Sequence, residues 1–184
     1  MLSRNEAFDL VKKNAAKRNV LYHMLAVEAI MRGTARYLEE DAELWGMVGL
    51  LHDVDYEKTE TTPEKHTLVA GELLSTLVSD QVTRAIKTHN YPNTHVMPES
   101  RMEKALIACD AISGLLVACA LVMPSRKLAD VKVESAVKKF KDKDFARGAD
   151  RQRILMCEEL GIPKERFFAI ALEELKNAAS QIGL

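Results

Sequence analysis

Apolar residues recur at intervals of three and four along most of the chain, the spacing that places them on one face of a helix. No segment shows the sustained alternation of apolar and polar residues that a half-buried strand requires. We therefore predict an all-α fold, a compact helical bundle. Helices are expected from Ser3 to about Ala15, over about 20–38, from Asp41 to His52-Asp53, from Pro63 through Leu77, from Asp80 to His89, over about 101–122, and two or three times within 130–184, the last reaching about Ile182.

Several helix ends carry recognisable signals. Ser3, followed three residues later by a glutamate, has the pattern of a capping box, and Asp41 is a typical N-cap. Pro63 suits the first turn of a helix, because proline lacks the N–H group that this position leaves unpaired. Between helices the chain is polar over 54–62 and contains two prolines over 90–100. We expect loops there, and the second is long enough to indicate a role at a functional site.

Length and composition are those of an ordinary globular protein. The 184 residues suit one domain, and 47% of them are apolar while 29% are charged. A net charge of −1 gives no reason to expect nucleic acid or a membrane surface as a partner. The longest apolar run, Leu115 to Met123, is shorter than the roughly 20 residues that a membrane span needs. We therefore expect neither kind of partner.

The cysteines and the N-terminal segment indicate a cellular compartment. Cys109, Cys119 and Cys157 form no CxxC pair and are odd in number, which predicts reduced thiols packed as small apolar residues. The first 18 residues lack the apolar stretch of a signal peptide. Both features favour a cytoplasmic protein.

Two carboxylates lie in apolar surroundings. Residues 44–58 read LWGMVGLLHDVDYEK, so that a stretch apolar on nearly every side ends in His52 and Asp53. Asp110 is the one charged residue within ALIACDAISGLLVACAL. Burying an ionised carboxylate without a partner costs several kcal/mol. Each of these two acids therefore needs a cationic partner inside the protein.

A metal site built from nitrogen and oxygen ligands satisfies both carboxylates. A divalent first-row metal suits such a mixed set, and a second ion can share the Asp53 carboxylate as a bridge. Paired ions of this kind suit displacement at phosphorus. The candidate ligands of the first ion are His23, His52, Asp53 and Asp110, and those added for the second are His66 and His89.

Most of these residues also have a purely structural interpretation. His52 and Asp53 can form a buried hydrogen-bonded pair that closes a helix, and His23 can be a core histidine with its hydrogen bonds satisfied. His66 can lie in the first turn of an exposed helix, and His89 can be an imidazolium favoured by a helix C-terminus. A purely structural interpretation of Asp110, in contrast, leaves its carboxylate unpaired.

The order His23, His52-Asp53, Asp110 resembles the H…HD…D pattern of the HD-domain superfamily of metal-dependent phosphohydrolases. LLHDVDYE is similar to the HDIG-type segment of that family, and HTLVAGELL and AIKTHN are similar to the parts that supply two extra histidines in its dinuclear members. The resemblance covers roughly residues 20–125. Dinuclear relatives often have two adjacent histidines where this chain has His89-Asn90.

The resemblance implies a helical fold with one HD-type domain over 1–184, in which the helices of about 126–184 pack on the metal-site core. It implies hydrolysis of a phosphate ester of a small molecule, often a nucleotide, by a metal-activated water. One or two divalent ions are expected, drawn from Mn, Fe, Ni, Co, Zn and Mg. Two alternatives stay open: a di-iron oxygenase of the same superfamily, and a non-catalytic sensor module that binds metal or nucleotide.

Two residues beside the His-Asp pair are further candidates for catalysis with Asp53. Asp55 or Glu57 can orient a metal ligand or give a proton to the leaving group. A solvated loop is an equally good interpretation of both.

Candidates for binding the substrate phosphate are Lys87 and Arg147. Arg147 belongs to a basic stretch from Arg126 to Arg153, but acidic residues interleave with its cations, as they do on solvated helices. His95, in the 90–100 loop, is expected to face solvent or substrate rather than metal.

Overall fold

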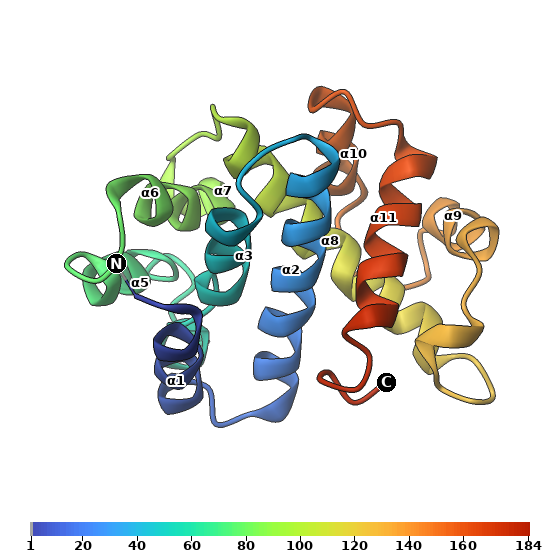
Figure 1. The fold of residues 1–184 in the computed structure, drawn as a ribbon, viewed down its shortest axis with the longest axis horizontal. Helices are drawn as coiled ribbons and strands as arrows, with labels where there is room; N and C mark the ends of the chain where they lie inside the picture. Colours follow the sequence, from blue (N-terminus) through green and yellow to red (C-terminus); the bar gives the residue numbers. More distant parts are fainter. Residues whose placement is uncertain (1) are drawn as a thin grey trace.

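Two long helices, α2 (Arg18–Tyr37) and α8 (Arg101–Leu121), pack against each other at the centre of the structure (Figure 1). The computed structural model describes residues 2–184, and over that range every regular element is helical. The predicted all-α fold is therefore confirmed. Buried apolar side chains from both central helices belong to one contiguous core.

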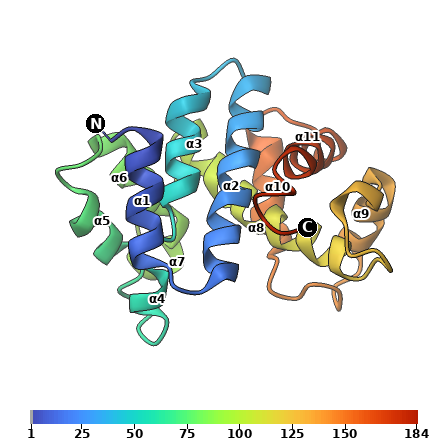
Figure 2. The same cartoon turned by 60° about the horizontal axis from the view of Figure 1, so that its bottom comes forward.

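The other helices flank this central pair (Figure 2). On one side lie α1 (Arg4–Asn14), α3 (Ala42–Leu51), α4 (Tyr56–Thr59), α5 (Leu68–Leu74), α6 (Asp80–His89) and α7 (Tyr91–Thr94). On the other lie the 3₁₀ turn η1 (Leu128–Asp130), α9 (Val133–Lys141), α10 (Arg151–Glu159) and α11 (Lys164–Asn177). The later helices contact the earlier ones: α10 lies on α8, and α11 lies on α2.

Two predicted helix starts are confirmed in atomic detail. The Ser3 hydroxyl accepts the backbone N–H of Glu6 at 3.3 Å, and the Glu6 carboxylate accepts the backbone N–H of Ser3 at 2.8 Å. Asp41 accepts the N–H groups of Glu43 and Leu44 at 2.9 and 3.0 Å. These bonds satisfy donors that a helix N-terminus leaves free, and each cap typically stabilises a helix by about 1 kcal/mol.

Predicted boundaries were wrong in several parts of the chain. The helix expected from Pro63 through Leu77 spans only Leu68–Leu74, and in the turn before it the N–H of Thr67 donates to the buried carboxylate of Asp55. The expected loops contain the one-turn helices α4 and α7. The last helix ends at Asn177 instead of near Ile182, and turns follow it. Short helices and turns of this kind are fixed by tertiary contacts, which periodicity does not report.

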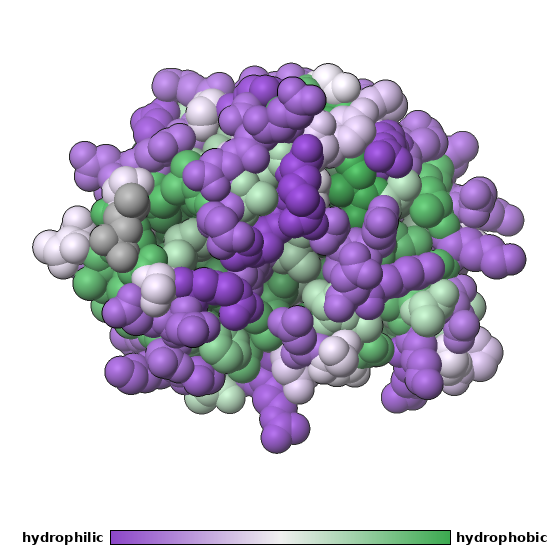
Figure 3. All heavy atoms as spheres, viewed as in Figure 1, coloured by the Kyte–Doolittle hydropathy of each residue, from purple (hydrophilic) through white to green (hydrophobic). Residues whose placement is uncertain are grey.

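Helix α8 is long and apolar enough to cross a membrane by length and composition, although the apolar run inside it is short. In the structure, 61% of its most apolar window is buried inside the protein, as in the core helix of a bundle. Hydrophilic side chains cover most of the molecular face seen in Figure 3. All three cysteines are buried free thiols, as predicted.

A glycine lets α3 approach α2 closely. A Cβ atom on Gly49 would lie 2.9 Å from the Cα of Glu28 and from the carbonyl oxygen of Val27, both on α2. No larger residue fits at that distance without moving one helix. Because His52 follows Gly49 by three residues, this close packing sets the C-terminal end of α3 against the side chains of α2.

Candidate metal centre

The six candidate ligands converge from five separate parts of the chain. His23 comes from α2, His52 and Asp53 from the end of α3, and His66 from the turn before α5. His89 ends α6, and Asp110 lies in the middle of α8. Successive imidazole rings lie edge to face, with centroids 5.1 Å apart for His23 and His52, 5.0 Å for His52 and His89, and 4.9 Å for His89 and His66.

Asp53 lies at the centre of this cluster, and its two oxygens face different histidines. Its Oδ2 lies 3.5 Å from the Nε2 atoms of both His23 and His52. Its Oδ1 lies 3.2 Å from Nε2 of His66 and 3.5 Å from Nε2 of His89. Two groups able to hold an ion result, and the Asp53 carboxylate belongs to both.

Asp110 closes the cluster on the side of α8. Its Oδ1 lies 3.1 Å from Nε2 of His23, and its Oδ2 lies 3.9 Å from Nε2 of His89. Its side chain is 20% exposed, whereas that of Asp53 is 9% exposed. Asp110 therefore lies nearer the opening of the site.

Hydrogen bonds hold three of the histidines with Nε2 directed into the cluster. His52 Nδ1 donates to the carbonyl oxygen of Gly49 at 2.8 Å, and His66 Nδ1 donates to the Asp55 carboxylate at 2.9 Å. His23 Nδ1 donates to the Ser113 hydroxyl at 3.2 Å, and that hydroxyl in turn donates a hydrogen bond to the carbonyl oxygen of Asp110. A histidine fixed in this tautomer offers the Nε2 lone pair that a metal requires.

The charges of the cluster favour ionised acids. Burial opposes ionisation of Asp53, but the neighbouring imidazoles of His52 and His66 favour the carboxylate more strongly and hold the Asp53 pKa well below its usual range. Burial likewise opposes ionisation of Asp110, and the bond from His23 lowers its pKa to about 2. Burial lowers the pKa of His89 to about 4, so this imidazole is neutral at pH 7.

The donor atoms fit a divalent metal. Asp53 Oδ1 and His89 Nδ1 are buried without a hydrogen-bond partner among residues 2–184. The Nε2 atoms of His23 and His52 face each other at 3.2 Å. Buried polar atoms are rarely left unpaired, and a cation between the Nε2 lone pairs and Asp53 Oδ1 satisfies these atoms of the cluster, although not His89 Nδ1, whose lone pair points away from its own Nε2. Oxygen and imidazole ligands together suit first-row divalent ions.

Comparison with known families agrees with this geometry. The family model described as HD domain matches residues 20–115, which is more than half of the chain. The chain belongs to the HD domain family. That family implies a metal-dependent hydrolase superfamily, and the matched range contains all six clustered ligands. No curated protein and no solved structure matches the chain.

In this HD domain, Asp55 is buried and holds the candidate ligand His66 in place. Its side chain is fully buried, and besides His66 it accepts the backbone N–H groups of Thr67 and Ala70 at 2.8 and 2.9 Å. Of the two roles considered for Asp55, the geometry supports orientation of a ligand. It does not support proton donation to a leaving group, because both carboxylate oxygens are already occupied.

We expect Asp55→Asn to weaken metal binding about 10- to 100-fold. If the amide oxygen faces the two backbone donors, its NH₂ group faces His66 and forces the proton onto Nε2, where it blocks coordination. Metal titration by isothermal calorimetry measures the effect. Asp41→Asn is the matched control, since asparagine caps a helix as well as aspartate does. An unchanged affinity in Asp55→Asn contradicts the positioning role.

Asn90, the position at which dinuclear relatives often have a second histidine, has a structural role here. Its amide donates to the carbonyl oxygens of Pro63 and His66, both at 2.9 Å, and its oxygen accepts from Asn93 at 2.8 Å. These bonds fix the turn that carries His66. Asn90 therefore supports the second group of ligands without joining it.

Metal binding should release protons. Burial lowers the pKa of His66, but bonds to Asp53 and Asp55 outweigh burial and raise it to about 9. Below that pH the metal-free site carries a proton on His66 Nε2, which faces Asp53 Oδ1 as an ion-pair contact, and an ion must displace it. We expect affinity to rise with pH up to about 9 and about one proton or more to be released at pH 7. Calorimetry in buffers of different ionisation heat counts these protons; an affinity independent of pH contradicts the prediction.

A cavity of about 460 Å³ opens beside the cluster, and one cation lines it that sequence reasoning did not single out. Arg153 lies at this cavity, with its guanidinium 5.4 Å from the centroid of the Tyr91 ring. Gly148 lies at the same opening. No pattern in the sequence distinguishes Arg153, because it ends a basic stretch of similar cations interleaved with acids.

The remaining candidates do not line this cavity. Glu57 accepts the backbone N–H of Lys17, and Lys87 packs over Gly71. The Arg147 side chain is 78% exposed and pairs with Asp144. The structure thus places neither predicted phosphate contact at the cluster; Arg153 takes the place expected for Arg147. His95 is exposed, as expected, and lies outside the cavity lining.

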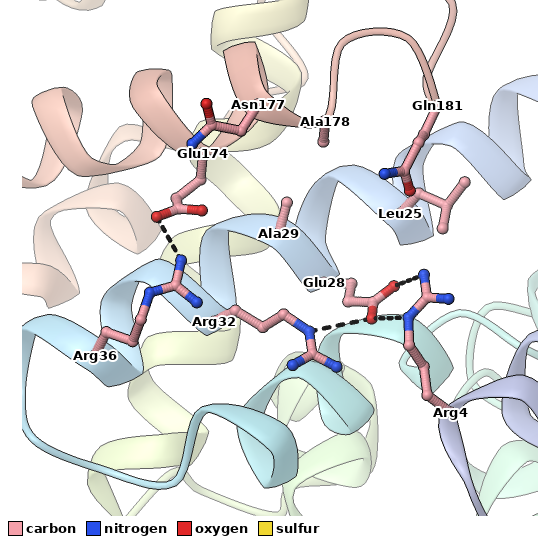
Figure 4. Close-up of a pocket in the computed structure, with 10 residues that line it drawn as sticks. All are labelled: Arg4, Leu25, Glu28, Ala29, Arg32, Arg36, Glu174, Asn177, Ala178 and Gln181. Atoms are coloured by element: carbon pink, nitrogen blue, oxygen red, sulfur yellow. Dashed lines mark hydrogen bonds and ion pairs between the residues drawn. The ribbon is translucent and has the colours of Figure 1, made fainter.

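A second charged cavity, of about 310 Å³, lies between α1, α2 and α11 (Figure 4). The buried Glu28 carboxylate accepts two hydrogen bonds from Arg4 and one from Arg32, and Arg36 pairs with Glu174. Carboxylates neutralise these arginines, and no ligand of the cluster lines this cavity. We interpret it as a structural ion-pair network.

Proposed function

We propose that this protein is a phosphohydrolase that cleaves a phosphate ester of a small molecule, with a nucleotide as the expected substrate class. One observation carries the proposal: each oxygen of the Asp53 carboxylate faces its own pair of imidazoles, in a chain of the HD domain family. We propose His23, His52, Asp53 and Asp110 as ligands of one divalent ion, and Asp53, His66 and His89 as ligands of another.

Bound divalent ions supply a water of lowered pKa and positive charge for the oxygens of a phosphoryl group. Two divalent cations outweigh the charge of Asp53 and Asp110, so the loaded site attracts a phosphate dianion. Arg153 adds a further positive charge at the cavity, and the Tyr91 ring holds its guanidinium in place. A guanidinium matches the geometry of phosphate oxygens through paired N–H donors. We propose Arg153 as the residue that orients the phosphate.

We expect Arg153→Ala to raise KM for a phosphate ester about tenfold or more with little loss of metal. The lost hydrogen bonds to a charged group are worth roughly 1.5–3 kcal/mol. Arg147→Ala is the matched control, because its side chain lies outside the cavity and pairs with Asp144. Steady-state kinetics and elemental analysis on both variants test this. Equal effects in the two variants contradict the role of Arg153.

Elemental analysis of the purified protein, followed by a panel of phosphate esters with each divalent metal in turn, tests the proposed function. Phosphate release that requires metal and stops with chelator supports it. Nucleotide binding without turnover under any metal points to a sensor, and substrate-dependent oxygen uptake with bound iron points to an oxygenase. Either outcome contradicts the proposal.

We further propose that residues 1–184 act as one domain. We expect this domain to work in the cytoplasm, where its buried thiols stay reduced, and without nucleic-acid or membrane partners.

A further inference from the structure

Three cavities meet at His23. The cavity beside the cluster shares His23 with a smaller one of about 310 Å³, which also contains Asp110, Gly148 and Arg153. A third cavity, of about 290 Å³, shares Asn19 and His23 with the first and Gly114 with the second. The three cavities therefore lie next to one another, and the third extends along α8 from His23.

The third cavity is largely apolar. It lies between α2, α8 and the turns that follow α11, and Leu121 at its edge is 51% exposed. Among the described residues that line it, His23 and Tyr22 alone have ionisable side chains. The apolar side chains that line it come from Tyr22, Ala26, Val117, Leu121, Ile182 and Leu184.

Gly114 lines both the smaller cavity that contains Asp110 and the largely apolar third cavity. No contact among the described residues requires a glycine at this position. It lies in the middle of α8, and a Cβ atom at this position would meet no atom within 4 Å. Glycine in a helix interior is less stable than alanine. A larger residue would fit at this position, so the glycine keeps open a space that a ligand can occupy. Glycine is the usual residue where a backbone lies close to a ligand.

We propose that the space over Gly114 binds an apolar group of the substrate, an aromatic ring or an aliphatic chain, attached to the phosphate at the metal centre. This inference rests on the proposed function for the position of the phosphate. Because His23 lines both cavities, we place the phosphate on its metal-centre side and the apolar group on its Gly114 side. The third cavity offers few polar groups, so it selects for apolar area and shape. The aromatic face of a nucleotide base fits such a space, although its polar edge does not.

Binding of phosphonates to the metal-loaded protein tests this subsite without requiring turnover. We expect 1-naphthylmethylphosphonate or octylphosphonate to bind at least about tenfold more tightly than methylphosphonate. The first indicates a site for rings, and the second a site for chains. Gly114→Phe should reduce the preference to near one while metal content is retained. Gly114→Ala should raise the melting temperature and weaken the preference, a combination that a purely structural glycine does not give.

Val122→Phe is the matched control, because it adds the same ring at the exposed end of α8, outside this lining; it should keep the wild-type preference. Equal binding of all three phosphonates to the wild-type protein overturns the proposal, as does a preference that survives Gly114→Phe. Hydrolysis of the matching esters is scored separately. Selective binding without hydrolysis supports the subsite and contradicts the proposed function, whereas hydrolysis without selectivity does the reverse.

Discussion

Asp53→Ala is expected to abolish metal binding at both proposed positions and to lower phosphate release about a thousandfold or more. The reason is the division of the carboxylate, whose Oδ2 faces His23 and His52 while Oδ1 faces His66 and His89. Removing the carboxylate leaves the imidazoles without the negative charge that joins them. Elemental analysis and the ester assay on the same samples measure both losses.

The control for this substitution is Asp9→Ala, which removes an exposed carboxylate paired with Lys12 on α1. It should leave metal content and activity at the wild-type level. Asp53→Asn preserves the volume and tests the charge alone. A folded Asp53→Ala protein with full metal occupancy would count directly against the bridging role.

His66→Ala and His89→Ala should each remove one ion and leave the other. Both side chains face Oδ1 of Asp53, whereas the ligands of the first ion lie on the Oδ2 side, apart from Asp110 near the opening. Metal content should fall from two equivalents towards one, and activity should fall about a hundredfold. The comparison with Asp53→Ala separates a two-ion site from a one-ion site.

His95→Ala is the matched control for both variants, because this histidine is exposed and lies outside the cavity. It should retain both ions. If His66→Ala and His89→Ala keep the full metal content, the second group of ligands has only a structural role. The wild-type protein would then hold one ion, and the structural interpretations of these two histidines would apply.

The sequence was sufficient to predict the helical fold and the meeting of six side chains, for an electrostatic reason. Asp53 and Asp110 lie in segments that are otherwise apolar, so burial was predictable from pattern and a partner from the cost of burying charge. The structure places both in contact with histidines from other helices. These two residues could be identified from the sequence because each is a charged residue within an apolar segment.

Other parts of the site lacked such a signal. Asp55 lies in a segment that reads as a polar loop, and only the structure shows it buried beneath His66. Arg153 and Arg147 lie in the same basic stretch and cannot be told apart from the sequence. In the structure Arg153, on α10, lines the cavity, whereas Arg147 is exposed and pairs with Asp144. Gly114 is notable only once the space beside it is known to be open. These features depend on tertiary contacts, which one sequence does not report.

Anomalous X-ray diffraction from crystals of protein never exposed to chelator shows directly whether metal ions occupy the cluster. We expect two metal peaks, one beside Oδ2 of Asp53 next to His23 and His52, and one beside Oδ1 next to His66 and His89. Crystals that show ordered side chains at this cluster and no metal peak between them, after soaking in each candidate ion, would contradict this expectation.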